Sequence, residues 1–93
     1  MHVTVRFLGA LRDRVGAPSL PVELPAGGTY RDILDAIGPT MKARLPDWAW
    51  DSARRSFSRG MMVSLGRNRD SRDETVQLDD GDEIVVVLPL GGG

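Results

Sequence analysis

The sequence has no cysteine, a single histidine, His2, and a single lysine, Lys42, among its 93 residues. Without cysteine, the chain can form neither disulfides nor thiolate metal sites, and it has no cysteine nucleophile. A serine nucleophile would have only one histidine to act as its base, and that histidine stands near the N-terminus. We therefore expect a protein that is not catalytic alone and that binds no cofactor or metal.

Long hydrophobic runs and a large net charge are also missing. The longest apolar run, residues 84–88, is far too short to cross a membrane, and the first residues do not resemble a signal peptide. The net charge of −1 does not imply attraction to nucleic acid. With 41% hydrophobic and 27% charged residues, the composition is typical of one small globular domain. We expect a cytoplasmic protein with neither membrane nor nucleic-acid partners.

Several segments have the hydrophobic patterns of strands. Apolar side chains alternate with polar ones in residues 2–7 and again in residues 19–25, which predicts a hairpin whose strands are joined by a connection containing Gly16 and Pro18. Residues 83–90 hold an unbroken apolar run, which favours a central strand covered on both faces. A short strand is expected in residues 61–66 and a brief extended piece in residues 75–78.

One helix has a signal at each end. Thr29 is a good N-cap, and Asp32 three residues later gives a variant of the capping box with aspartate in place of glutamate. Gly38 and Pro39 are expected to stop this helix. Its apolar stripe is formed by Ile33, Leu34 and Ile37. A further short helix is possible before Pro46, and residues 46–60 are expected to be irregular or partly helical.

The order of these elements predicts an α+β fold. If the last strand lies beside the first and parallel to it, one helix packs across a mixed sheet of four to five strands. That arrangement is the β-grasp, or ubiquitin-like, fold. We expect residues 1–90 to form this domain and residues 91–93 to form a flexible glycine tail.

Several motifs that resemble binding sites have simpler structural interpretations. Residues 79–83 lack the spacing of a calcium loop and predict a turn. The glycines of residues 25–29 lack the lysine of a phosphate-binding loop. The six arginines of residues 54–72 alternate with acidic residues and indicate a solvated surface; if they bind anything, an acidic protein or a phosphate-bearing ligand is favoured. Packing roles are expected for Trp48, Trp50, Met61 and Met62.

The glycine tail is the strongest candidate for a functional segment. Gly91, Gly92 and Gly93 follow the most hydrophobic strand with only Pro89 and Leu90 between them. Glycine has no Cβ, so such an arm can thread a narrow channel and place a carboxylate in another protein's active site. A carboxylate is a poor electrophile and must first be activated, for example as an acyl adenylate. The carboxylate of Gly93 is thus the predicted reactive group, against the alternative of a frayed terminus.

Four segments together resemble the MoaD/ThiS family of sulfur carriers, particularly its MoaD branch. These are "VRFLGALRDRVG", "VELPAGGTYRDIL", "DDGDEI" and "LPLGGG", which follow in order over about two thirds of the chain. The resemblance implies a β-grasp fold. It also implies that a ubiquitin-activating-type enzyme uses ATP to adenylylate Gly93, and that a sulfurtransferase or another sulfide source converts the adenylate to a thiocarboxylate. The thiocarboxylate then gives its sulfur to a synthase subunit or another acceptor enzyme, as in molybdopterin biosynthesis.

The resemblance also implies which residues meet these partners. Leu8 and Val87 fall where MoaD proteins often have phenylalanines that touch the activating enzyme. The remaining residues expected at the partner's channel and its mouth are Leu88, Pro89, Leu90, Gly91 and Gly92. Two alternatives stay open: a ubiquitin-like modifier joined to proteins through Gly93, and a ubiquitin-fold interaction module that makes no use of the tail.

Overall fold

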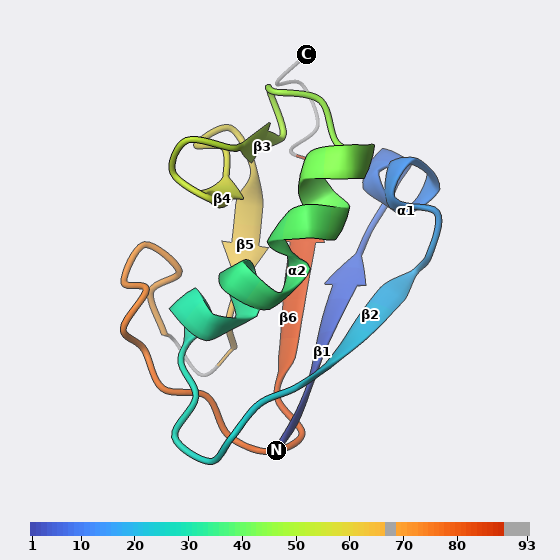
Figure 1. Cartoon of the computed structure of the whole chain (residues 1–93). Helices are drawn as coiled ribbons and strands as arrows, with labels where there is room; N and C mark the ends of the chain where they lie inside the picture. Colours follow the sequence, from blue (N-terminus) through green and yellow to red (C-terminus); the bar gives the residue numbers. More distant parts are fainter. Residues whose placement is uncertain (67–68, 89–93) are drawn as a thin grey trace.

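The computed structural model describes residues 1–66 and 69–88. Its main layer is a four-stranded sheet with the strand order β2-β1-β6-β5, and helix α2 (Tyr30–Arg44) crosses one face of this sheet (Figure 1). β1 pairs antiparallel with β2 and parallel with β6, and β6 pairs antiparallel with β5. The bounds are β1 His2–Phe7, β2 Ser19–Glu23, β5 Met62–Ser64 and β6 Glu83–Val87. The fold is the α+β β-grasp that the sequence predicts.

Strand β6 occupies the predicted central position, but only one of its faces is fully covered. Ile84 and Val86 point toward α2 and are 0% exposed, while Val85 and Val87 on the other face are half-buried and Glu83 is exposed. The prediction that both faces are covered was therefore wrong. No described helix or strand packs on the outer face. Val85 and Val87 are therefore covered only in part, by side chains of the neighbouring strands, and otherwise contact solvent.

Helix α2 (Tyr30–Arg44) begins as predicted and continues beyond its predicted end. The capping box is complete, because the Thr29 hydroxyl accepts a bond from the Asp32 N–H and the Asp32 carboxylate accepts one from the Thr29 N–H. The prediction that Gly38 and Pro39 stop the helix was wrong. Met41 continues the buried stripe at 0% exposure. The free energy gained by its burial offsets the cost of the backbone hydrogen bond that Pro39 cannot donate.

A short helix, α1 (Ala10–Val15), occupies the connection between β1 and β2. The sequence suggested only a connection with breakers at this place. Leu11 and Val15 are one helical turn apart and both are buried in the core, which explains why this segment winds into a helix. Gly16 ends the helix in the left-handed conformation, with φ of 85°.

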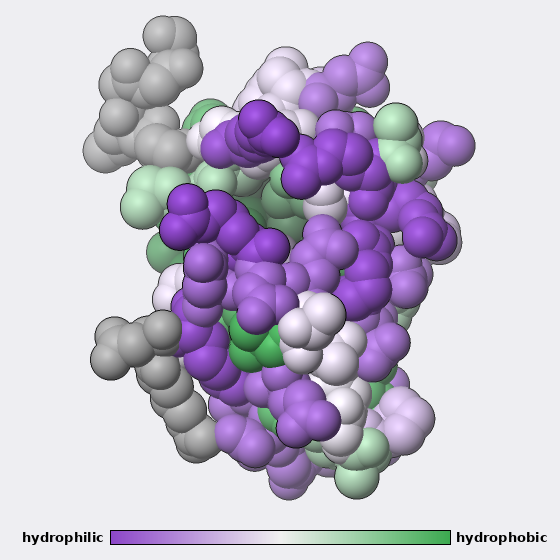
Figure 2. Space-filling view, turned by 90° about the vertical axis from the view of Figure 1, so that its left-hand side faces the viewer, coloured by the Kyte–Doolittle hydropathy of each residue, from purple (hydrophilic) through white to green (hydrophobic). Residues whose placement is uncertain are grey.

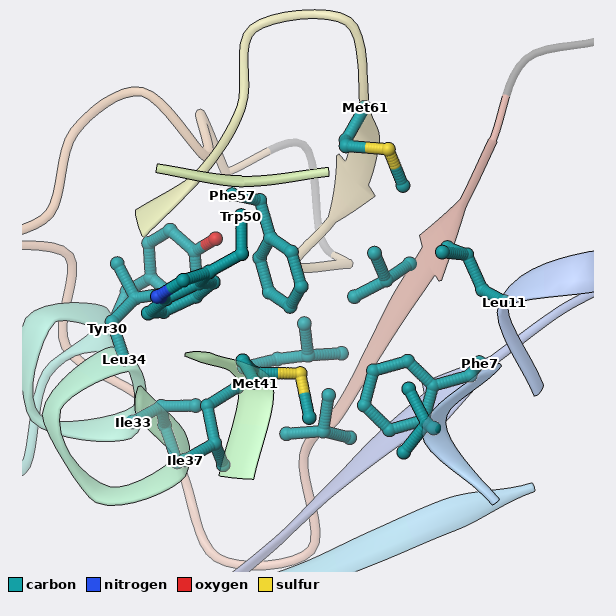
Figure 3. Packing of buried hydrophobic residues seen from close by; sticks show 14 of the residues in the cluster. Phe7, Leu11, Tyr30, Ile33, Leu34, Ile37, Met41, Trp50, Phe57 and Met61 are labelled. Atoms are coloured by element: carbon teal, nitrogen blue, oxygen red, sulfur yellow. The ribbon is translucent and has the colours of Figure 1, made fainter. Parts of the chain in front are cut away.

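Residues 46–60 are irregular for most of their length, as expected, but they contain no helix and instead include a short two-stranded sheet that the sequence did not predict. Strand β3 (Trp50–Asp51) pairs antiparallel with β4 (Ser56–Phe57). The rings of Trp50 and Phe57 pack edge to face, with centroids 5.1 Å apart and planes at 88°. Figure 3 shows both rings packed over the residues of α2 in the hydrophobic core. Burial of this aromatic pair anchors a hairpin whose strands are too short to stand alone.

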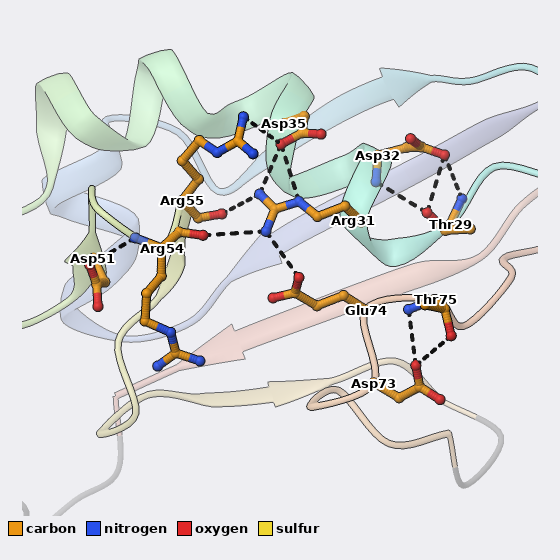
Figure 4. A network of polar contacts seen from close by, with 10 residues as sticks. All are labelled: Thr29, Arg31, Asp32, Asp35, Asp51, Arg54, Arg55, Asp73, Glu74 and Thr75. Carbon is orange, nitrogen blue, oxygen red and sulfur yellow. Dashed lines mark hydrogen bonds and ion pairs between the residues drawn. The ribbon is translucent and has the colours of Figure 1, made fainter.

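Arg31 at the start of α2 connects the helix to two loops (Figure 4). Its guanidinium pairs with Asp35 at 2.9 Å and with Glu74 at 3.1 Å. It also donates to the backbone carbonyls of Arg54 and Arg55 in the β3–β4 turn. This cation therefore holds the β3–β4 turn and the loop around Glu74 against α2. The extended piece expected at residues 75–78 is reduced to one isolated bridge, between Thr29 and Gln77.

Candidate functional site

The carboxyl end of β6 is the place from which the predicted glycine arm departs. Phe7 pairs with Val86 in the β1–β6 ladder, and the N–H of Leu8 donates to the Val86 carbonyl at 3.1 Å. On the other side of β6, Met62 lies directly opposite Val87. Residues opposite one another in a sheet share a face, so Leu8, Val87 and Met62 form one row across the outer face.

We call this row of Leu8, Met62 and Val87 the exit patch. Leu8 is 41% exposed and Met62 is 57% exposed, so they are two of the large hydrophobic side chains that stand most in solvent. The patch ends one row away, where Ser64 lies opposite Val85 and Arg6 lies on the other side of Val85. Arg6 of that row forms an exposed ion pair at 3.1 Å with Glu83, which lies further from the strand end. The apolar surface is thus confined to the strand end.

Leu88 differs from Val87 in its packing. It is half-buried and packs against the hydrophobic core, as expected from the alternation of side chains along an extended chain. The core therefore fixes the backbone immediately before the predicted arm. The predicted site residues Pro89, Leu90, Gly91, Gly92 and Gly93 lie outside the described residues, as does the predicted boundary between domain and tail.

The structure places Leu8 and Val87, which the family resemblance implies as contacts of the activating enzyme, in one row, and it adds Met62. The sequence favoured a core role for Met61 and Met62, which is correct for Met61 at 8% exposure and wrong for Met62. The missed signal is the alternation in β5. Met61 and Leu65 both point into the core, so Met62 between them must point outward.

The other candidate motifs have structural roles in the described part of the chain. The Asp82 carboxylate accepts bonds from Arg69 at 2.8 Å and from the Asp79 N–H at 2.7 Å, which closes the turn before β6 as predicted. The start of α2 is already occupied by the carboxylate of Asp32. Trp50 is buried, whereas Trp48 is 47% exposed and has the Arg14 guanidinium 5.4 Å above its ring.

Within residues 1–66 and 69–88, no group of three or more histidine or acidic side chains is arranged to hold a metal ion. Over the same residues, no helix has the length and apolar character needed to cross a membrane. The one described group whose pKa is strongly raised is the Tyr30 hydroxyl, because burial disfavours its ionised form and Glu74 adds negative charge nearby. Tyr30 and Glu74 therefore do not act as a nucleophile and its base. The exit patch is the best-defined feature beside the predicted reactive group, the carboxylate of Gly93.

The model of the ThiS family matches residues 5–93. The chain belongs to the ThiS family. This membership agrees with the β-grasp fold, and the small ubiquitin-like proteins of this family are carriers rather than catalysts.

Solved structures with the same fold come from archaea and a eukaryote. SAMP1 from Haloferax volcanii is 18% identical, with 100% of each chain covered and a TM-score of 0.73. Urm1 from Trypanosoma brucei is 19% identical, with 99% of this chain and 95% of that chain covered and a TM-score of 0.69. A Pyrococcus furiosus protein, provisionally named molybdopterin converting factor subunit 1, is 21% identical, with 97% of this chain and 99% of that chain covered and a TM-score of 0.62.

Proposed function

We propose that this ThiS-family chain is a sulfur carrier that works through the carboxylate of Gly93. A ubiquitin-activating-type enzyme transfers AMP from ATP to this carboxylate and releases pyrophosphate. Hydrosulfide from a sulfide source then displaces AMP and leaves a thiocarboxylate, which delivers its sulfur to an acceptor in cofactor or metabolite biosynthesis. No cofactor needs to be bound by the carrier itself, since ATP is used by the activating enzyme.

The observation that carries the proposal is the position of the exit patch at the root of the predicted arm. Leu8 and Met62 expose apolar surface beside Val87, and Leu88 fixes the strand end in the core. An enzyme that docks on this patch would receive the arm in a defined direction. Leu90, Pro89, Gly91 and Gly92 would then lie along its channel, with Gly93 at its active site.

An exchange assay tests the activation step. The activating enzyme of the same organism is incubated with the chain, ATP and labelled pyrophosphate. We expect label to enter ATP with the full chain and not with a chain that lacks Gly92 and Gly93. Equal exchange with both chains would refute activation at Gly93, because the deletion leaves the described domain intact.

A protein modifier joined through Gly93 is the second candidate, because the Haloferax volcanii neighbour is named a small archaeal modifier protein. Both functions share the adenylate and differ in the nucleophile that follows. A modifier predicts heavier adducts that resist thiol reduction and disappear with the deletion of Gly92 and Gly93. A sulfur carrier for molybdopterin synthesis, as the Pyrococcus furiosus name suggests, predicts a stable complex with a large synthase subunit.

A further inference from the structure

A hollow of about 900 Å³ lies on the side of the molecule between the β3–β4 hairpin, β5 and the loop of residues 71–74. Figure 2 views this side and shows apolar atoms between hydrophilic residues that surround them. Leu34, Phe57, Met61, Met62 and Val63 contribute the apolar part of the lining, so the hollow borders the exit patch at Met62. Its polar part comes from Tyr30, Arg54, Ser56, Ser58, Arg59, Ser71, Arg72 and Glu74.

The hollow borders a free edge of the sheet. β5 pairs with β6 on one side, and no described strand pairs with its other side. Since the Val86 carbonyl binds Leu8 of β1, the backbone groups of Val85 and Val87 point toward β5 and meet Ser64 and Met62. The backbone N–H and C=O of Val63, between these two, therefore point away from β6 and into the hollow.

The opposite edge of the sheet is protected in a way that β5 is not. Val22 and Leu20 of β2 pair with Val3 and Val5, so the backbone of Pro21 between them faces the free edge. Proline has no N–H to donate, and prolines on edge strands discourage the addition of a further strand. Of the two edges, β5 is therefore the one that carries no proline against a further strand.

Two arginines without ion pairs to described residues line the hollow beside the open edge. The guanidinium groups of Arg54 and Arg59 are exposed and form no ion pair or side-chain hydrogen bond with any described residue. The acidic side chain in the lining, Glu74, is already paired with Arg31. Arg31 also binds the Arg54 carbonyl, which fixes the backbone that carries this cation.

A polar group in the wall of the hollow also lacks a partner. Ser56 is 6% exposed, and its hydroxyl forms no hydrogen bond within the described structure. Buried hydroxyl groups are normally hydrogen-bonded, because an unpaired one costs free energy. A ligand group that reaches this wall and lets the hydroxyl turn toward it would remove that cost.

We propose that this hollow binds an extended acidic peptide segment of a partner protein, which adds to the sheet as a strand beside β5. Its backbone pairs with the N–H and C=O of Val63. Alternate apolar side chains enter the hollow over Phe57 and Met61, and the carboxylates between them meet Arg54 and Arg59. Strand addition gives affinity through the backbone, and the arginines select the charge of the segment.

A titration followed by nuclear magnetic resonance tests the proposal on the full chain. The probe is the acetylated and amidated peptide Asp-Val-Glu-Val-Asp-Val-Glu. Two matched peptides serve as controls: one has lysine in place of each acidic residue, and the other carries N-methyl groups on alternate amides. We expect the acidic peptide to shift the amide signals of Val63 and of residues 54–59, and both control peptides to bind roughly tenfold more weakly or not at all.

Charge reversal in the protein gives the second arm. The double variant Arg54→Glu/Arg59→Glu should bind the acidic peptide about tenfold more weakly, while Arg12→Glu on helix α1 should bind it as the unchanged chain does. Equal binding of the lysine or N-methylated peptide would overturn the proposal, as would shifts confined to surfaces away from β5. Deletion of Gly92 and Gly93 should leave this binding unchanged, so its outcome is separate from that of the sulfur-carrier proposal.

Discussion

Met62 lies directly opposite Val87 across the β5–β6 ladder, and both side chains lie on the outer face of the sheet, at the carboxyl end of β6. Together with Leu8, they form an apolar row where the predicted arm begins. A hydrophobic side chain that is more than half exposed contributes little to folding. Its position is explained if another protein covers it.

The first prediction concerns this exit patch. Met62→Glu should raise the KM of the activating enzyme for the carrier about tenfold, because a charge enters an apolar contact, and should leave the stability of the carrier nearly unchanged. Ser64→Glu is the matched control, since it places the same charge on the same strand and face one row away. If both variants behave alike in pyrophosphate exchange, the patch does not bind the enzyme.

The second prediction concerns Arg31, whose side chain is 23% exposed and bridges Asp35, Glu74 and the β3–β4 turn. Arg31→Ala should lower the free energy of unfolding in urea by about 2 kcal/mol, because two carboxylates and two carbonyls lose their donor. Arg6→Ala, which breaks an ion pair of half-exposed side chains, should cost less than about 1 kcal/mol. Equal losses would show that the Arg31 network contributes no more than a surface pair.

The third prediction follows from the unexpected length of α2. Pro39 is exposed within the helix, so Pro39→Ala should restore an N–H donor and stabilise the chain by about 1 kcal/mol in urea denaturation. Pro46→Ala, just beyond the helix, is the control and should not stabilise it. A helix that stopped at Gly38 would gain nothing from the first change.

The fourth prediction uses the single tyrosine of the chain, Tyr30. Burial and the nearby Glu74 raise its pKa well above the usual value of about 10. The folded chain should therefore show no tyrosinate absorbance at a pH where the urea-unfolded chain is already ionised. Because the pKa is raised on folding, the contribution of Tyr30 to stability is complete below about pH 10 and declines as the pH rises above it. Coincident titration curves of the folded and unfolded chains would contradict this.

The sequence predicted the four main strands and the start of α2, because hydrophobic patterns and capping are local signals, and it placed the last strand beside the first. It wrongly placed a break between this helix and a further short helix before Pro46, because Gly38 and Pro39 are local signals too, whereas the structure has one continuous helix. The buried stripe that overrides them continues through Met41 to Leu45, which pack on the core only in the folded chain. The pairing of Trp50 with Phe57 was equally out of reach, since two-residue strands have no pattern of their own.

The candidate site was predictable only in part. Leu8 and Val87 could be chosen from the family resemblance, and the structure places them in one row. Met62 enters this row through the register of β5 against β6, which neither strand encodes alone. The open edge at Val63 depends on the same register and on the absence of a further described strand beside it.

The mass of the intact carrier tests the central proposal most directly. The chain is purified after incubation with its activating enzyme, ATP and a sulfur donor, beside a chain that lacks Gly92 and Gly93. We expect the full chain alone to yield a species heavier by the difference between one sulfur and one oxygen atom, located at Gly93 by fragmentation. If the full chain retains only its carboxylate under these conditions, the protein is not a sulfur carrier.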